Sequence, residues 1–230
     1  SADKLFGFSL QRGSLNDTMK DIIVNAVGAF FVSIAGYYYI KSGQKNVVSK
    51  FVMNFIEKYP KVFTSGKDEK KEEKLSNLIS QGESGKLEFK STLRRNLHTN
   101  EIDKKIENSV LKTLTAYLNS NGGTLLVGVS NSGEILGVEK DGFENEDKLN
   151  LHLSNLIKQK IGKEYFSLIE FEIIKIDEKS VVKIDCRESQ KPIFLKSDEG
   201  EEFYVRNGPA SVRLEGSSLI EYVERRFKEK

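Results

Sequence analysis

The sequence predicts an α/β domain of the α+β kind, a mixed sheet with flanking helices, preceded by a single hydrophobic N-terminal helix. Residues 102–118 carry apolar side chains at helical spacing. Residues 124–129 form a short apolar run after two glycines, as in a buried strand. Residues 22–40 contain no charged side chain. Helical and strand patterns follow one another over residues 75–230, which we expect to form one domain.

Further elements are expected along this domain. The turn at residues 130–133 and a short strand at 135–138 would form a hairpin with strand 124–129. By the same criteria of periodicity and turn residues, we expect a helix over 146–161, strands over 168–176, 180–186, 193–195 and 203–206, and a closing helix over 217–227.

Composition limits the classes of function. Of 230 residues, 36 are Lys or Arg and 34 are Asp or Glu, so the formal net charge is only +2. Bulk positive charge therefore cannot hold this protein to nucleic acid, and any such binding needs a local patch. One cysteine, Cys186, and two histidines exclude a disulfide framework and a cysteine-rich zinc site. A bound metal would be a hard ion held by oxygen.

Residues 22–40 are the most apolar stretch of the chain. These 19 residues would form a helix about 28 Å long, close to the bilayer hydrocarbon thickness of about 30 Å. Residues 37–39 are tyrosines, which prefer the membrane interface. We expect a transmembrane helix. A buried or oligomer-packing helix and a secretion signal are the alternatives, and the signal lacks a clear small-residue cleavage site.

The flanks of this stretch suggest an orientation and a partner. Lys41, Lys45 and Lys50 follow it with no acidic residue between them, which favours a cytoplasmic C-terminal domain. Ala29 and Ser33 are four residues apart, so a second helix could approach closely on that face. The sequence thus predicts a single-pass membrane anchor with a cytoplasmic domain, and homo-oligomer formation.

The remaining N-terminal part divides into three segments. Residues 1–21 are an N-terminal segment of mixed charge. Residues 41–63 are expected to form a juxtamembrane amphipathic helix, with the apolar pattern in 47–59, which either lies on the membrane surface or packs against the main domain. Residues 64–74 are strongly charged and form either a solvated linker or the exposed start of a helix.

Two glutamates are candidate metal ligands. Leu87 and Phe89 alternate with Glu88 and Lys90 as in a half-buried strand, so Glu88 and Lys90 share a face. Glu83 precedes Glu88 by five residues, and the two carboxylates could converge on one Mg or Mn ion that activates water. The alternative is an ordinary charged strand edge.

Two basic clusters and one glycine pair are further candidates. Asn119 and the pair Gly122 and Gly123 favour a tight chain reversal over phosphate binding, and neither the Walker nor the Rossmann motif is present. A strand with Tyr and Arg beside a glycine turn can contact nucleic acid, although it can equally be a strand with one exposed face. The candidate nucleic-acid-binding residues are Lys90, Arg94, Arg95, Tyr204, Arg206 and Arg213.

Three motifs together carry a family resemblance. They are E-x-x-x-x-E-F-K at residues 83–90, N-x-x-G-G-x-L-x-x-G-V at 119–129 and F-Y-V-R-x-G at 203–208. Their order and spacing resemble the Schlafen-like AlbA family of DNA-binding domains of bacteria and archaea, which also occurs in animal Schlafen proteins. The resemblance covers about residues 75–227 and implies a nucleic-acid-binding α/β domain.

The resemblance also implies a catalytic alternative. The nucleolytic Schlafens hold a divalent ion with three carboxylates and cut structured RNA such as tRNA. Their first two ligands correspond to Glu83 and Glu88, whereas the acidic turn of the family reads Ser130, Asn131 and Ser132 here. Asn131 would take the third catalytic position, and an amide without negative charge should weaken binding of Mg or Mn.

We therefore expect a membrane-anchored nucleic-acid-binding protein, with RNA slightly favoured over DNA by the resemblance. Phosphates would be contacted by Lys90, Arg94, Arg95, Arg206 and Arg213. One alternative is a Mg- or Mn-dependent endoribonuclease. Another is an oligomeric interaction protein, with a role in defence against phage that rests on family association.

Overall fold

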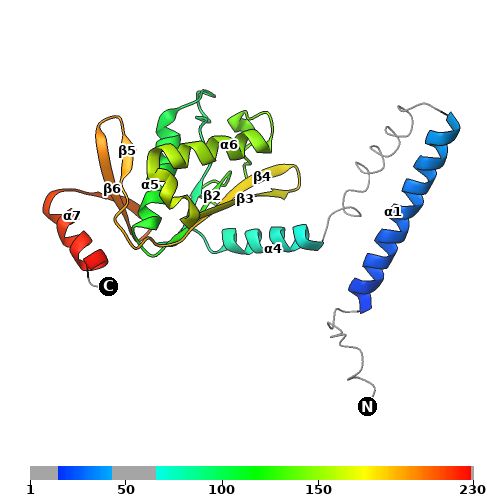
Figure 1. Cartoon of the computed structure of the whole chain (residues 1–230), viewed down its shortest axis with the longest axis horizontal. Helices are drawn as coiled ribbons and strands as arrows, with labels where there is room; N and C mark the ends of the chain where they lie inside the picture. Colours follow the sequence, from blue (N-terminus) through cyan, green and yellow to red (C-terminus); the bar gives the residue numbers. More distant parts are fainter. Residues whose placement is uncertain (1–14, 43–65, 229–230) are drawn as a thin grey trace, which may run out of the picture. The chain divides into compact units, whose positions relative to one another are not determined.

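The computed structural model describes residues 15–42 and 66–228. The chain forms two compact units, Ser1–Gly66 and Lys67–Lys230. In the first unit the described element is helix α1, Leu15–Ser42 (Figure 1). The amphipathic helix expected within 41–63 lies outside the described residues.

Helix α1 extends the predicted helix 22–40 at both ends. Within the described parts of the chain, no helix has an apolar stretch of the length and hydropathy needed to cross a membrane. The predicted single-pass anchor with a cytoplasmic domain is therefore wrong. Within α1 the Ser33 hydroxyl donates to the Ala29 carbonyl at 2.8 Å. Self-association through this face stays a prediction.

Helix α4, Gly66–Ser80, opens the second unit. Of the two outcomes that the sequence left open for residues 64–74, the described residues 66–74 are the start of a helix. Leu75 is buried, and Leu78 and Ile79 are half-buried beside it. The highly charged first half of α4 is therefore continued by an apolar face.

The main sheet has four strands in the order β1-β2-β4-β3. Strand β1 runs parallel to β2, whereas β4 is antiparallel to both β2 and β3, so the expected mixed sheet is confirmed. Helix α5 connects β1 to β2, which makes the parallel pairing possible because parallel strands need a crossover. The elements are β1 (Leu87–Lys90), α5 (Lys104–Leu118), β2 (Gly123–Val127), β3 (Ile169–Ile176) and β4 (Lys179–Cys186).

The predicted hairpin after β2 is wrong. The turn forms, because the Ser130 amide donates to the Glu134 carbonyl at 2.9 Å, but residues 135–138 are not a strand and retain one bridge, from Ile135 to Val129. The physical reason is that both edges of β2 are already paired, with β1 on one side and β4 on the other.

Apolar clusters cover both faces of this sheet. Leu125 and Val127 of β2 pack in the cluster that contains α5 and α6 (Glu146–Ile157). Leu126, which points the other way along the strand, packs in the second cluster with Leu75 of α4. The alternation follows from the two-residue period of a strand, and it produces three layers: α4, the sheet, and α5 with α6.

A second, antiparallel sheet has the order β5-β6-β7. The sequence analysis missed β7, which follows a turn where Gly208 has φ +58°. Phe203, Tyr204 and Val205 of β6 are all buried, so the expectation of one exposed strand face is wrong at these positions. The elements are β5 (Leu195–Ser197), β6 (Gly200–Asn207), β7 (Ala210–Leu214) and helix α7 (Gly216–Val223), with short helical turns at Glu139–Asp141, Lys158–Gly162, Lys163–Leu168 and Glu224–Lys228.

Asn119 joins α5 to the second sheet. Its side chain is buried; Nδ2 donates to the carbonyls of Ile193 at 2.7 Å and Tyr204 at 3.0 Å, while Oδ1 accepts from the Ile193 amide at 2.9 Å. The hydroxyl of Tyr222 in α7 donates to the Asn119 carbonyl at 2.8 Å. One residue at the end of α5 therefore satisfies backbone groups on two other segments, a structural role that explains it without a phosphate ligand.

Replacing Asn119 by Ala should lower the free energy of unfolding by about 2–4 kcal/mol, because buried amide and carbonyl groups would lose their partners. Urea unfolding of the full chain measures this change. The matched control is Asn155→Ala on the exposed side of α6, which should change stability by less than about 0.5 kcal/mol. Equal effects of the two substitutions would contradict the role of Asn119.

Candidate functional site

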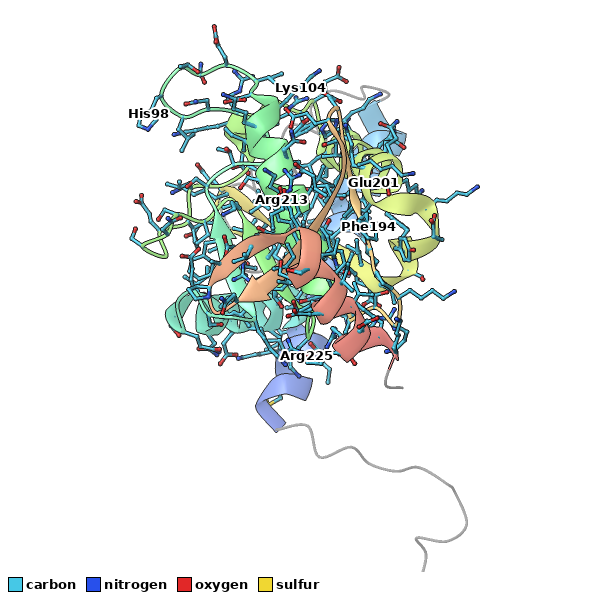
Figure 2. The ribbon with its side chains drawn as sticks, turned by 90° about the vertical axis from the view of Figure 1, so that its left-hand side faces the viewer. His98, Lys104, Phe194, Glu201, Arg213 and Arg225 are labelled. Atoms are coloured by element: carbon cyan, nitrogen blue, oxygen red, sulfur yellow. The ribbon has the colours of Figure 1, made fainter. Side chains whose placement is uncertain are left out.

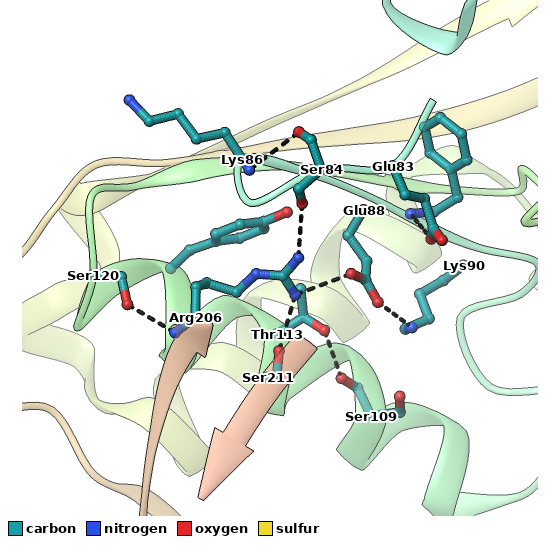
Figure 3. A network of polar contacts seen from close by, with 12 residues as sticks. Glu83, Ser84, Lys86, Glu88, Lys90, Ser109, Thr113, Ser120, Arg206 and Ser211 are labelled. Carbon is teal, nitrogen blue, oxygen red and sulfur yellow. Dashed lines mark hydrogen bonds and ion pairs between the residues drawn. The ribbon is translucent and has the colours of Figure 1, made fainter. Parts of the chain in front are cut away.

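The three sequence motifs meet at an ion pair between Glu88 of β1 and Arg206 of β6 (Figure 3). Arg206 Nη1 lies 2.9 Å from Glu88 Oε2, and Lys90 Nζ lies 2.6 Å from the other carboxylate oxygen, Oε1. The Arg206 side chain is 4% exposed and the Glu88 side chain 12%. Glu88 and Lys90 do share a face of β1, as predicted, but on this face Glu88 is buried and Lys90 is half-buried.

Arg206 also connects segments that are far apart in the sequence. Its Nη2 donates to the Ser84 carbonyl at 3.0 Å, and its Nη1 donates to Ser211 Oγ at 3.1 Å. Its backbone amide donates to Ser120 Oγ at 2.8 Å. The guanidinium therefore links the turn before β1 to β7, and the backbone amide links β6 to Ser120, just after α5.

The ring of Tyr117 in α5 lies beneath the guanidinium of Arg206. The guanidinium carbon lies 4.9 Å from the centre of the Tyr117 ring, and the hydroxyl donates to the Thr124 carbonyl at 3.1 Å. A Cβ atom at Gly123 would overlap this ring, so glycine is required there. The close-packing role expected for the glycine pair is thus confirmed. Burial raises the pKa of Tyr117, and the nearby Arg206 opposes this in part.

Glu83 and Asn131 differ from Glu88 in exposure and in their contacts. Glu83 is exposed, and its Oε1 accepts a hydrogen bond from the Phe89 amide at 3.0 Å. Asn131 belongs to the exposed turn 130–133, whose Gly133 lies against Ile79 of α4. Because Phe89 packs on the α4 side of the sheet, alternation along β1 directs Glu88 to the opposite side.

The expected divalent metal therefore does not fit these residues. Among the described residues, no three carboxylate, histidine or cysteine side chains are grouped to hold one ion. Both carboxylate oxygens of Glu88 are engaged by Lys90 and Arg206. The amide at Asn131 would bring no compensating charge.

Arg94 and Arg95 belong to a separate loop. The buried carboxylate of Asp141 accepts hydrogen bonds from the backbone amides of Leu93 at 2.8 Å, Arg94 at 2.8 Å and Arg95 at 2.9 Å. The Arg94 guanidinium lies 3.7 Å from the Phe143 ring centre and donates through Nε to the Asp141 carbonyl. Both arginines are therefore held by this loop rather than beside Arg206.

Arg213 and Tyr204 lie next to each other on the second sheet, where they are cross-strand partners. Arg213 keeps 44% of its side chain exposed on β7 (Figure 2), and it pairs with Glu202 at 2.9 Å and with Glu215 at 2.5 Å. Tyr204 is buried, with its hydroxyl bonded to Glu202 at 3.0 Å and Lys112 over its ring. The structure thus buries the ring of Tyr204, which was expected to contact nucleic acid.

The structure brings Lys90, Arg206 and Arg213 to one side of the domain. Arg206 lies opposite Ser211 in the β6–β7 ladder, and Arg213 is two residues further along β7 on the same face. The sequence analysis missed Ser84, Ser211 and Tyr117 as members of this site. A backbone carbonyl and a serine carry no signal of their own in the sequence, and the glycine pair indicated a tight chain reversal without naming the side chain that packs on it.

A family model described as Schlafen, AlbA_2 matches residues 83–215. This is more than half of the chain, so the chain belongs to the Schlafen AlbA_2 family. Membership indicates a nucleic-acid-binding domain, in agreement with the resemblance seen in the sequence.

Two solved structures are similar to this chain. The DIP2311 protein from Corynebacterium diphtheriae shares 16% sequence identity and a TM-score of 0.46, over 70% of this chain and 29% of that one. The N-terminal domain of a RecG-related protein from Nitrosomonas europaea shares 19% identity and a TM-score of 0.38, over 63% of this chain and 90% of that one. This chain spans less than a third of the Corynebacterium protein.

Replacing Glu88 by Gln should destabilise the protein by about 3–5 kcal/mol, because Arg206 would keep a buried charge without an anionic partner. Thermal or urea unfolding of the full chain measures the change. Glu83→Gln is the matched control; its amide oxygen can still accept from Phe89, so we expect a loss below about 1 kcal/mol. In the double variant with Arg206→Met the losses should not add; additive losses would show that the two charges do not interact.

Replacing Tyr117 by Phe should make stability less sensitive to alkaline pH. Because the folded-state pKa is raised, the unfolded tyrosine ionises near its ordinary value of about 10 while the folded one keeps its proton. The contribution of protonated Tyr117 to the free energy of unfolding is thus complete below about pH 10 and is lost as the pH rises above it. Urea unfolding between about pH 9 and 11 should show a slope smaller by up to about 1.4 kcal/mol per pH unit in the variant. Identical slopes would contradict this.

Proposed function

We propose that this domain binds RNA through the side where β1 meets β6 and β7, with Lys86, Lys90 and Arg213 contacting phosphates. Family membership supports nucleic-acid binding, and the resemblance to Schlafens that act on structured RNA favours RNA over DNA. The observation that carries the location is the ion pair of Arg206 with Glu88, because it brings the turn before β1 and the β6–β7 hairpin together.

The accessible cations of this side support the proposal. Lys86 is exposed and forms no ion pair with a described residue, and Lys90 keeps 25% of its side chain exposed. Arg213 is exposed although it also pairs with two glutamates. A Cβ at Gly85 would lie 3.5 Å from the Gly208 carbonyl, so the turn that carries Lys86 lies directly beside the β6–β7 turn.

Charge balance sets the expected strength of binding. Arg206 is neutralised by Glu88, and the net charge of the chain is only +2. Affinity should therefore come from a few contacts, and three phosphate contacts on the duplex stem of an RNA hairpin correspond to a slope of about −3 in a plot of log affinity against log salt. Because Arg206 is neutralised, we assign it to the framework that supports the binding surface. From the sequence, Arg206 was expected to contact phosphates.

Lys86→Ala and Arg213→Ala should each weaken RNA binding several-fold and reduce the salt slope by about 1 for each lost phosphate contact. Fluorescence anisotropy with a labelled RNA hairpin, between about 50 and 200 mM salt, measures both quantities. The matched control is Lys175→Ala on β3, the opposite edge strand of the main sheet; it should leave both unchanged.

The same titration with DNA of equal sequence tests the preference for RNA. Equal affinity for the two would remove the preference while leaving nucleic-acid binding. No binding to either at about 50 mM salt, where phosphate contacts are strong, would refute the proposal. An equal loss in Lys175→Ala would show that the binding side is wrong.

A further inference from the structure

We propose that Arg206 is the permanent counter-ion of Glu88, so that the glutamates of the E-x-x-x-x-E-F-K motif bind no divalent cation in this protein. Glu88 is then a positioning residue that holds the turn carrying Lys86. The positioning role rests on the proposed RNA binding, whereas the statement about metal does not.

Each oxygen of the Glu88 carboxylate already has one positively charged partner. One oxygen lies 2.6 Å from Lys90 Nζ and the other lies 2.9 Å from Arg206 Nη1. A Mg or Mn ion would have to take an oxygen from one of these partners and then lie beside both positive charges. At 12% exposure of the Glu88 side chain, little water remains to screen that repulsion.

Arg206 cannot easily move aside to admit an ion. Its side chain is 4% exposed, and it donates to the Ser84 carbonyl and to Ser211 Oγ. The ring of Tyr117 lies beneath it, in space that Gly123 leaves free. Withdrawal of the guanidinium would break these hydrogen bonds and leave Glu88 buried with Lys90 as its one cation, so the arginine is part of the framework.

The nearby oxygen ligands are engaged elsewhere. Glu83 Oε1 accepts from the Phe89 amide, which orients this carboxylate along the start of β1. After the turn 130–133, the next acidic residues are Glu134, Glu139 and Asp141. The buried carboxylate of Asp141 accepts hydrogen bonds from three backbone amides of the loop at Leu93. A carboxylate trio is thus not assembled from these residues, and a permanent cation is the simpler partner for Glu88.

The consequence for binding follows from one hydrogen bond. Arg206 is oriented by Glu88 and holds the Ser84 carbonyl at 3.0 Å, two residues before Lys86. Ser84 in turn accepts through Oγ from the Lys86 amide at 3.3 Å. Loss of the Glu88 charge should therefore release the turn and displace Lys86, although Glu88 itself touches no RNA.

Titration of the full chain with Mn²⁺ alone, followed by the electron paramagnetic resonance of the free ion, tests the statement about metal. We expect no saturable site tighter than about 1 mM, the weak end of oxygen-ligand sites, and no difference between wild type, Glu83→Gln and Glu88→Gln. A tighter site that either substitution abolishes would overturn the inference. This readout is independent of whether the protein binds RNA.

A double-mutant cycle tests the positioning role. Glu88→Gln should weaken RNA-hairpin binding as Lys86→Ala does, and the two losses should not add, because both act through the same lysine. Additive losses would overturn the role. Arg206→Lys is the second variant: it keeps the charge beside Glu88 but loses the fork that reaches Ser84, and it should also fail to add to Lys86→Ala. RNA binding by the wild type that requires Mg²⁺, or is abolished by EDTA, would overturn the inference while leaving the proposed function in place.

Discussion

Glu88 and Arg206 neutralise each other where little water reaches them, and the surrounding contacts depend on that neutralisation. A buried charge without a partner is strongly unfavourable, so the guanidinium stays where Nη1 also donates to Ser211 and Nη2 to the Ser84 carbonyl. The turn before β1 and the β6–β7 hairpin are thereby held together. Unlike an apolar contact, this ion pair fixes the direction as well as the distance between the two segments that it joins.

Helix α5 connects the two sheets and holds Glu88 and Arg206 in place through its contacts with both. Its apolar face belongs to the main core cluster, Tyr117 lies under Arg206, and Asn119 at its end binds backbone groups near β5 and on β6. Since both sheets pack on one helix, a shift of α5 would move Glu88 and Arg206 relative to each other. The geometry of the site is therefore a property of the core of the second unit rather than of its loops.

Local patterns predicted the helices and most strands well. The helical period of residues 102–118 and the apolar run after Gly123 correspond to α5 and β2. The hairpin after β2 was wrong because pairing depends on which strands compete for an edge, and β1 and β4 occupy both edges. The membrane anchor was wrong because no helix among the described residues is long and apolar enough to cross a membrane.

The sequence by itself determined most elements of the domain, the family and the residues that its motifs contain, because these depend on local period and on residue identity. The tertiary structure alone decided what those residues do. Arg206 and Tyr204 stand in a strand whose pattern suits an exposed face, but α5 covers them and turns one into a buried counter-ion and the other into core. An ion pair between residues more than a hundred positions apart produces no periodic pattern in the sequence, since it depends on where distant segments meet.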